Sequence, residues 1–459
     1  MGDELKLIGL AIAALAIASF IYAAYISSPP LIQIPDIGKW LEERMEQEQV
    51  RSQKIDPALQ QHFATNPKAP TRMFISGVNA TELQLQGFKV LKAGKYADWA
   101  VVEGDYEDLQ KLLNNPRVQK VIYDERVRVV NADLFSQIPR PVVQSLGWNL
   151  EAIRADIAHR YNFTGRGAVV AILDTGVNYN LEDLRHNYLG GYDFAYNDPE
   201  PDDVYSHGTE CASIIVANGT ITGVAPSASY YALKVLNDRG GGNWSDVIAG
   251  LEWVLDKVSS GERIDVVTMS LGAELAPPEL KTICDMLYSR GVILVAASGN
   301  SGSRTSLYPA AYDTVISVAA TDIYKHVARF SNGGALVAAP GVQVPVLSSD
   351  GKIYYGDGTS YAAPHVAGVL LLVEAERDIT PGQAITLLKI STDEIHDPED
   401  KVEYGQINAV KAINNALNLN LSEERAWYEY LSEQWVQILI GLVVLAGALK
   451  LIAWKHEGG

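Results

Sequence analysis

Four long apolar runs constrain the fold of this chain more than any other feature of its sequence. They are almost continuous stretches of small and branched aliphatic residues, and helix-like segments separate several of them, for example at 245–259 and 278–290. The runs are AVVAIL (168–173), DVVTMSL (265–271), VILVAAS (292–298) and TVISVAA (314–320). Strands that are apolar on both faces are typical of a parallel sheet covered by helices on both sides. The sequence therefore predicts a doubly wound α/β domain with a mostly parallel sheet, in which ligands bind beyond the carboxyl ends of the strands.

A second and smaller pattern precedes that domain. Two capping pairs, Asn79 with Glu82 and Asp105 with Asp108, predict the starts of two short helices. Strand-like segments surround them at residues 72–76, 88–92, 99–103 and 118–123. The resulting order, βαββαβ, predicts a ferredoxin-like α+β domain. This fold serves many functions, so by itself it does not indicate one.

An apolar segment lies near each end of the chain. Residues 7–26 contain no charged side chain, and about 20 residues of helix span a hydrocarbon core of about 30 Å. Residues 435–454 form a similar run bounded by tryptophans, which is typical of a membrane interface. We predict transmembrane helices at 5–26 and 435–454. The alternatives are a cleaved signal peptide for the first and an amphipathic surface helix for the second.

The charges around the C-terminal run predict its orientation. Lys450 and Lys455 lie at its end or beyond it, whereas glutamates are frequent just before it. By the positive-inside rule the C-terminus lies in the cytoplasm, and with two spans so does the N-terminus. The residues between the spans would then lie on the extracytoplasmic side, with the membrane lipid as a partner of the two spans.

The composition excludes several classes of function. The chain has 37 lysines and arginines against 55 aspartates and glutamates, a net charge of −18, so we expect no nucleic-acid partner. Two cysteines are too few for a disulfide scaffold or a four-thiolate metal site. We predict that Cys211 and Cys284 are buried free thiols, with a disulfide between them as the alternative. The sequence also lacks the common metal-binding and nucleotide-binding motifs.

Three residues at predicted strand and helix ends form a candidate catalytic set. Asp174 follows the first apolar strand, while His207 and Ser360 each precede an apolar helix-like run. An imidazole can take the proton of a serine hydroxyl, and a carboxylate can hold the imidazole in the required tautomer. The chain order Asp, His, Ser is the order found in subtilisin.

Two further residues complete this candidate site. Pro364 predicts that its helix begins close to Ser360, where the helix dipole favours an anionic oxygen. Asn300 follows the apolar strand at 292–298. Its amide and the backbone N–H of Ser360 are the candidate donors to the oxyanion of a tetrahedral intermediate.

These residues stand in motifs that resemble those of the subtilisin-like serine proteases. Five motifs occur in the family's order and spacing within about residues 150–415: Asp174-Thr175-Gly176, His207-Gly208-Thr209, Ser270-Leu271-Gly272, Ser298-Gly299-Asn300 and Gly358-Thr359-Ser360. Five in register are a specific match, whereas one tripeptide would be weak. The resemblance implies a secreted or cell-surface endopeptidase with a seven-stranded parallel sheet. It would act on proteins or peptides through an acyl-enzyme intermediate and need no cofactor for its chemistry.

The same resemblance implies a role for each motif. Asp174, His207 and Ser360 would be the catalytic triad, with Asn300 as the oxyanion residue. Two segments would pair with an extended substrate and two side chains would wall the subsites on its acyl side. The pairing segments are Gly240-Gly241-Gly242 and Ser270-Leu271-Gly272, and the wall residues are Trp244 and Leu236. The expected specificity pocket contains no acidic residue, so we expect an apolar or aromatic residue before the scissile bond.

Residues 68–130 resemble the subtilisin propeptide, an intramolecular chaperone and inhibitor. We therefore expect a zymogen that cuts itself, with a new N-terminus between Asn131 and Val143, and the propeptide domain as a partner of the enzyme. The expected organisation is a transmembrane helix (5–26), a stalk (27–67), the propeptide-like domain (68–130), a linker with the processing site (131–149), the catalytic domain (150–420), a juxtamembrane segment (421–434) and a second transmembrane helix (435–454).

Two departures from the family pattern bear on the site. Tyr361 replaces the methionine that usually follows the nucleophile, and the loop 217–223 is shorter than the calcium loop of bacterial subtilisins, so we expect no calcium there. A nearby acidic run resembles a calcium loop of some thermostable members and predicts a structural calcium site, with a solvated loop as the alternative. Its ligands would be Asp193, Asp198, Glu200 and Asp202.

Two functions other than a membrane-anchored endopeptidase stay open on the sequence alone. One is a catalytically silent subtilisin-like binding or scaffold protein at the membrane. The other is a recognition module formed by the small domain on a scaffold. The four filled catalytic positions favour the enzyme. Of the remaining histidines, we predict a structural role for His365 and a surface position for His186.

Overall fold

The structure is a computed structural model that describes residues 45–46, 49–124, 127–130 and 147–423. The chain divides into two compact units, residues 1–56 and 57–459, and residues 49–54 of the first unit are helical. Both predicted transmembrane segments and most of the predicted processing linker lie outside the described residues. No helix within the described part combines the length and the apolar character that crossing a membrane requires.

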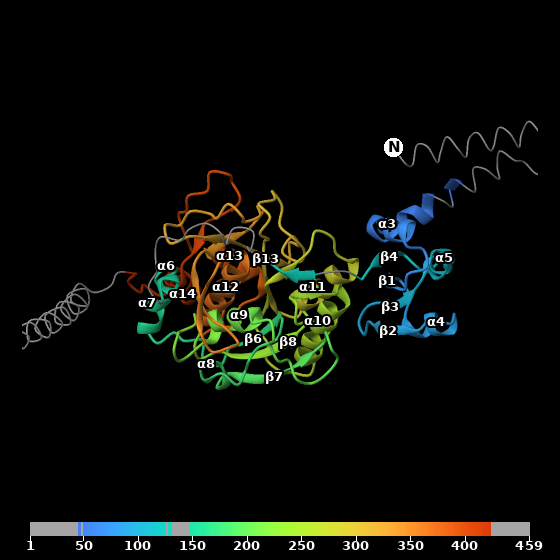
Figure 1. The fold of residues 1–459 in the computed structure, drawn as a ribbon. Helices are drawn as coiled ribbons and strands as arrows, with labels where there is room; N and C mark the ends of the chain where they lie inside the picture. Colours follow the sequence, from blue (N-terminus) through green and yellow to red (C-terminus); the bar gives the residue numbers. More distant parts are fainter. Residues whose placement is uncertain (1–44, 47–48, 125–126, 131–146, 424–459) are drawn as a thin grey trace, which may run out of the picture. The chain divides into compact units, whose positions relative to one another are not determined.

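A nine-stranded sheet forms the centre of the large domain (Figure 1). Its order is β17-β18-β14-β13-β12-β10-β6-β8-β7. The strands are β6 (Val169–Asp174), β7 (Tyr188–Asp193), β8 (Ser229–Lys234), β10 (Val266–Met269), β12 (Ile293–Ala297), β13 (Val315–Thr321), β14 (Val337–Pro340), β17 (Thr392–Asp393) and β18 (Gln406–Ile407). Adjacent strands are parallel except β17 and β18.

The sheet confirms the prediction of a mostly parallel α/β fold and corrects one detail. The seven parallel strands that the resemblance implied are wrong for this chain, because nine strands pair and one of them runs antiparallel. The two additional strands at one end of the sheet, β17 and β18, are two residues long each. Such short strands carry no apolar run, so the hydrophobic pattern of the sequence does not reveal them.

Helices cover both faces of this sheet. The residues of β6 are buried alternately against the helices of one face and of the other. Val170 and Ile172 of β6 belong to one buried cluster, while Val169, Ala171 and Leu173 belong to another on the opposite face. Buried residues of the first cluster come from α7 (Ala155–Arg160), α9 (His207–Val216), α12 (Thr359–Glu374), α13 (Pro381–Lys389) and α14 (Ala409–Leu417). Those of the second come from α10 (Trp244–Ser259) and α11 (Pro278–Ser289).

Shorter elements complete the large domain. They are α6 (Trp148–Ala152), α8 (Glu182–Arg185), β9 (Gly241–Gly242), β11 (Leu271–Gly272) and the antiparallel pair β15 (Val344–Leu347) and β16 (Ile353–Gly356). The strands β9 and β11 belong to a separate three-stranded sheet, whose middle strand is β5 (Val127–Val129). This small sheet brings a segment that precedes the large domain in sequence into contact with it.

The small domain is a four-stranded antiparallel sheet with the order β2-β3-β1-β4. Its elements are β1 (Thr71–Ser76), α4 (Ala80–Leu85), β2 (Val90–Ala93), β3 (Trp99–Gly104), α5 (Tyr106–Asn114) and β4 (Lys120–Tyr123). Asp105 and Asp108 form a reciprocal capping box at α5, whereas at α4 only the Asn79 side chain caps. Glu82 instead accepts hydrogen bonds from Asn115 and Arg117.

The predicted stalk at 27–67 extends too far along the chain. Residues Pro57–Thr65 form helix α3, whose Leu59 and Phe63 are buried. The ring of His62 lies 5.5 Å from the ring of Tyr123 in β4. Only two of the nine residues in this helix are buried. The sequence is polar overall, so the short apolar stripe that packs on the small sheet is not apparent from composition.

Candidate active site

The carboxyl end of β6 and the first turn of α9 bring Asp174 and His207 together. The imidazole Nδ1 lies 2.7 Å from the Asp174 Oδ1 atom, and both side chains are at most 2% exposed. Burial alone lowers the pKa of His207, but the adjacent Asp174 carboxylate raises the pKa well above its ordinary value. The pair can therefore accept and hold a proton on the imidazole.

Sequence reasoning missed Asp203, which holds this region in place. Its Oδ1 atom accepts hydrogen bonds from Thr175 Oγ1 and from the backbone N–H of Ser206 at 2.8 Å each. Its Oδ2 atom accepts from the N–H and the hydroxyl of Thr209 at 2.8 and 2.6 Å. The carboxylate thus ties the turn after β6 to the first turn of α9. The sequence did not indicate this structural role, because Asp203 stands at the end of the acidic run beside the predicted calcium ligands.

The nucleophile candidate Ser360 lies in the first turn of α12 and is fully buried. Pro364, four residues later, has no N–H to donate to the Ser360 carbonyl. That carbonyl instead accepts from Ser270 Oγ at 2.7 Å and from Cys211 Sγ at 3.5 Å. The carbonyl that the proline leaves without a helical donor is therefore satisfied by side chains of two neighbouring segments.

The carbonyl of Val130 lies between the candidate nucleophile and the candidate oxyanion donor. The Ser360 hydroxyl donates to the Val130 carbonyl oxygen in a short hydrogen bond. Asn300 Nδ2 donates to the same oxygen at 2.7 Å. The Asn300 amide is held in this orientation because its Oδ1 atom accepts from the N–H and the hydroxyl of Thr359 at 2.9 and 2.8 Å. One peptide carbonyl of the chain thus occupies the position that a scissile carbonyl would take.

The residues before Val130 pair with both predicted edges of the binding groove. Strand β5 is antiparallel to β11, with Val129 opposite Leu271, and antiparallel to β9, with Arg128 opposite Gly241. Val130 continues the ladder, since its N–H donates to the Ser270 carbonyl at 3.2 Å. The chain therefore lies between these edges as an extended peptide.

The predicted wall residues lie in the same apolar cluster as the start of β5. Trp244 and Leu236 are buried together with Val127 and Leu271. The Trp244 indole N–H donates to the Leu275 carbonyl at 2.9 Å, which fixes the ring. The apolar side chain of Val127, three residues before Val130, is thus accommodated beside the first turn of α10.

The His207 Nε2 atom is buried and has no hydrogen-bond partner among the described residues. In this state the Ser360 hydroxyl donates to backbone carbonyls, those of Val130 and, at 3.4 Å, Ser270. Cys211 nonetheless contacts both residues, because its Sγ lies 3.9 Å from His207 Nδ1 and 3.5 Å from the backbone carbonyl oxygen of Ser360. The three predicted catalytic residues thus lie in one buried neighbourhood, with the Asp174–His207 contact formed.

Three of the four predicted calcium ligands accept hydrogen bonds from nearby residues. Asp193 accepts from the Tyr196 N–H, Asp198 from the Glu200 N–H, and Glu200 from the Tyr179 hydroxyl. None of the four belongs to a group of three or more described ligand residues whose atoms lie within 4.8 Å of one another. The arrangement therefore does not form an assembled calcium cage, and the site stays a prediction.

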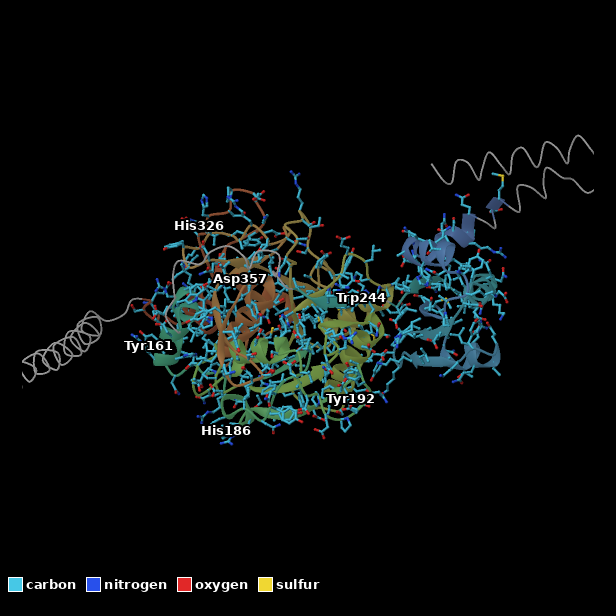
Figure 2. All side chains as sticks on the ribbon, in the orientation of Figure 1. Tyr161, His186, Tyr192, Trp244, His326 and Asp357 are labelled. Atoms are coloured by element: carbon cyan, nitrogen blue, oxygen red, sulfur yellow. The ribbon has the colours of Figure 1, made fainter. Side chains whose placement is uncertain are left out.

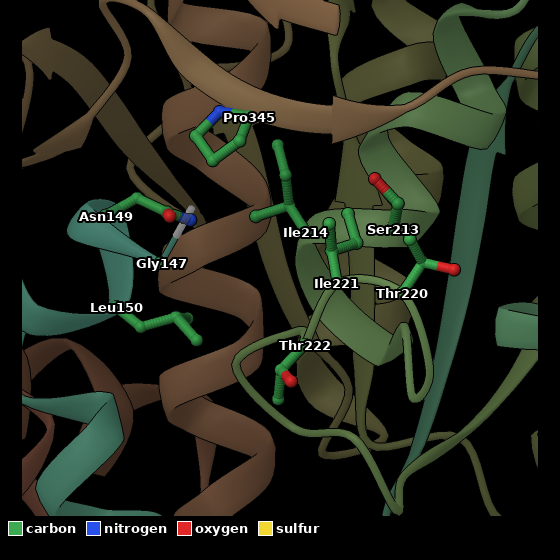
Figure 3. A pocket seen from close by; sticks show the side chains of 9 residues that line it. All are labelled: Gly147, Asn149, Leu150, Ser213, Ile214, Thr220, Ile221, Thr222 and Pro345. Atoms are coloured by element: carbon green, nitrogen blue, oxygen red, sulfur yellow. The ribbon is translucent and has the colours of Figure 1, made fainter. Parts of the chain in front are cut away.

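Asp183 ties down the shortened loop at 217–223. Asp183 accepts from the Ile221 N–H at 3.1 Å and from the Thr220 hydroxyl at 3.2 Å. A cavity of about 170 Å³ lies beside this loop, between α6, α9 and Pro345 (Figure 3). Its lining offers hydroxyls and the Asn149 amide, but no carboxylate, among the described residues.

The remaining predicted residues have structural or surface positions. Cys211 and Cys284 are both free and buried, so the alternative of a disulfide between them is excluded. His365 is buried, with Nδ1 2.7 Å from the Tyr361 carbonyl and Nε2 2.9 Å from Asn149 Nδ2. His186 is exposed at the surface of the large domain (Figure 2).

A parallel α/β sheet with a buried aspartate–histidine pair at its carboxyl edge, and a serine at the mouth of a buried helix, defines a serine hydrolase. The chain belongs to the subtilase family, whose sequence pattern matches residues 165–408. It is therefore a serine endopeptidase.

Individual relatives match between half and about seven tenths of the chain. Subtilisin E of Bacillus subtilis is 36% identical over 298 residues, which cover 63% of this chain and 73% of subtilisin E. The thermophilic serine proteinase of Bacillus sp. strain AK1 is 34% identical over 335 residues, 71% of this chain and 78% of that protein. Subtilisin DY of Bacillus licheniformis is 38% identical over 239 residues, 50% of this chain and 85% of its own length.

Proposed function

We propose that this endopeptidase is a membrane-anchored zymogen that cuts its own chain after Val130, with Asp174, His207 and Ser360 as its triad and Asn300 as its oxyanion residue. The single observation that carries the proposal is the Val130 carbonyl oxygen. It accepts from Ser360 Oγ and from Asn300 Nδ2, while the residues before it pair with both edges of the groove.

The chemistry follows from this geometry. The Ser360 Oγ attacks the carbonyl carbon of the scissile bond, and its proton passes to His207 Nε2, the atom with no other partner among the described residues. Asp174 holds the Nδ1 proton and stabilises the imidazolium. The oxyanion is stabilised by Asn300 Nδ2 and by the backbone N–H of Ser360. The imidazolium then protonates the leaving amine, which leaves an acyl-enzyme for water to hydrolyse.

The position of the cut is supported by the register of β5. Val130 is the residue whose carbonyl meets the nucleophile, so the bond to Asn131 is the one to break. This agrees with a new N-terminus between Asn131 and Val143. Val130 is also apolar and 5% exposed, which suits a specificity pocket without an acidic residue.

Contacts between the small domain and α10 support its role as an inhibitor. Asp124 accepts from Arg72 Nη2 at 2.8 Å and from the Ser245 hydroxyl at 2.9 Å, in the first turn of α10. Glu252 of α10 accepts from the backbone N–H of Lys95 at 3.1 Å and from the Trp99 indole at 3.4 Å. These contacts hold the small domain on the helix whose first turn walls the substrate groove.

Ser360→Ala tests the triad and the self-cleavage together. Without the hydroxyl no acyl-enzyme forms, so we expect the purified variant to keep its full mass while the wild type yields a fragment beginning at Asn131. The wild type should also bind a serine-directed fluorophosphonate, and the variant should not. Equal processing of the variant would show that another protease makes the cut. A folded wild type that takes no label would favour the catalytically silent scaffold.

The membrane anchors are tested separately. The two uncharged runs at 7–26 and 435–454 motivate them. We expect the Ser360→Ala chain to stay in the membrane fraction after carbonate extraction, and a protease added outside sealed cells to digest the catalytic domain. Release by carbonate would contradict the anchoring without affecting the proposed chemistry.

A further inference from the structure

A hydrogen bond beside the triad joins two residues that have no part in the mechanism above. Tyr361 directly follows Ser360 on α12, and Glu210 lies three residues after His207 on α9. The Tyr361 hydroxyl donates to Glu210 Oε2 at 2.7 Å. The bond therefore connects the first turn of the helix that carries the nucleophile with the first turn of the helix that carries the base.

The surroundings of this pair are unusual for a carboxylate. Tyr361 is 6% exposed and belongs to an apolar cluster with Trp148, Ile214, Val344 and Val346. Its ring centroid lies 5.8 Å from that of His207. Burial raises the pKa of Glu210 above its ordinary value, although the charge of His207 and hydrogen bonds from Tyr361 and Ser348 partly offset this rise. A charged group so close to an apolar cluster costs stability unless its partners compensate, and those partners include both helices of the site.

We propose that the Tyr361–Glu210 hydrogen bond is a positioning pair that sets the approach of the Ser360 hydroxyl to the His207 imidazole. The inference rests on the triad proposed above and deepens it. The His207 side of the site is already fixed by Asp174 and, through Thr209, by Asp203. The hydrogen bond from Tyr361 to Glu210 fixes the Ser360 side of the site relative to the His207 side, because Tyr361 is the residue next to Ser360.

The energetic argument concerns the attack step. Displacing a reacting group by about 1 Å costs on the order of 100-fold in rate. Loss of the phenol hydroxyl removes this hydrogen bond between the two helices without touching the substrate groove formed by β9 and β11. The expected consequence is a lower kcat with little change in KM.

Tyr361→Phe tests the positioning role directly. We expect kcat for a peptide substrate to fall about 10-fold, less than the loss for a full displacement of about 1 Å. KM should stay within about twofold of the wild-type value. Tyr231→Phe is the matched control, because Tyr231 in the middle of β8 donates to Glu262 at 2.8 Å and neither residue belongs to the site. Both variants lose one tyrosine–glutamate hydrogen bond and should lose similar thermal stability, but the control should keep its kcat.

The pH profile of Glu210→Gln gives a second measurement, which a purely structural role of the pair would leave unchanged. The amide oxygen can still accept from Tyr361, so the helices stay connected, but the negative charge near His207 is lost. The groups that face His207 are Asp174 from β6, Cys211 and Glu210 from α9, and Tyr361 from α12. Without one carboxylate the imidazolium is less stabilised, so we expect the acid limb of the kcat/KM profile to move to lower pH.

The outcomes separate this inference from the proposed function. Equal kcat values for Tyr361→Phe and Tyr231→Phe, or an unshifted acid limb in Glu210→Gln, would overturn the positioning pair. A Tyr361→Phe effect on kcat that persists undiminished in a Glu210→Ala background, where no acceptor for the phenol remains, would assign the effect to the ring rather than to the bond, and would overturn the proposal as well. Activity that survives Ser360→Ala would instead refute the triad itself.

Discussion

At the scale of single residues, the site depends on orientation as much as on identity. Asn300 can donate to the Val130 carbonyl because Thr359 holds the other end of its amide with two hydrogen bonds. Gly208 has to be glycine, because a Cβ there would lie 2.0 Å from the Gly176 carbonyl oxygen. The sequence predicts both residues through their motifs, but it does not reveal which neighbours hold them.

Asn300→Ala should affect the transition state rather than substrate binding. Removal of one oxyanion donor costs about 2.7–4 kcal/mol in subtilisin, and we expect a similar loss here, on the order of 100-fold to 1,000-fold in kcat. KM should change little, because the donor acts mainly on the charged intermediate. Single-turnover kinetics with a peptide ester would check this. A fall in affinity with unchanged kcat would mean that Asn300 serves binding instead.

At the scale of elements, helix α12 combines the nucleophile with a structural histidine. His365 connects α12 to α6 through Asn149, and burial lowers its pKa from the ordinary 6.5 to about 4. The unfolded chain therefore takes up a proton on this residue below about pH 6.5, while the folded protein does not until about pH 4. The contribution of His365 to stability is accordingly lost as the pH falls through this window.

His365→Gln should consequently flatten the acid side of the stability profile. In the Ser360→Ala background, which prevents self-digestion, we expect a stability loss of about 1–2 kcal/mol at pH 7 from the altered hydrogen bonds. Between pH 6.5 and 4 the melting temperature of the variant should fall less steeply than that of its parent. Parallel slopes in the two melting curves would show that other groups govern the acid sensitivity.

Apolar patterning predicts the buried strands and main helices closely, but not the elements that lack an apolar run. The helix expected at 245–259 is observed as α10 at Trp244–Ser259, because its apolar face repeats with helical spacing. The short strands β17 and β18 were missed because each is two residues long. The resemblance implied that residues 240–242 and 270–272 pair with an extended peptide and that the end of the propeptide-like domain occupies the active site. It did not give the register of β5, which depends on contacts across more than a hundred positions.

At the scale of the whole molecule, the groove and the small domain are held by different contacts. The segment β5 and Val130 occupies the groove, whereas Glu252 and Asp124 hold the folded small domain on α10. A cut after Val130 would break the covalent link to the catalytic domain without breaking the second set of contacts. The small domain should therefore remain bound after processing.

Glu252→Ala should weaken that retention. Each hydrogen bond to a charged group contributes about 1.5–3 kcal/mol, so loss of this carboxylate should speed dissociation of the cleaved fragment about 10-fold to 100-fold. Native mass spectrometry of the detergent-solubilised, processed protein would follow it. Glu262→Ala, which alters a glutamate paired with Lys257 beyond the end of α10, is the control and should retain the fragment. Equal retention in both variants would place the main contact elsewhere.

The register of β5 also specifies the shape of an inhibitor. Val127, Arg128, Val129 and Val130 fill four consecutive positions up to the serine, and the last carbonyl already meets both the hydroxyl and the amide donor. A tetrapeptide aldehyde with the sequence Val-Arg-Val-Val would present the same face to the enzyme, and its carbonyl carbon could form a reversible hemiacetal with Ser360. The chain thus encodes, within its own length, the template for a compound that would block it.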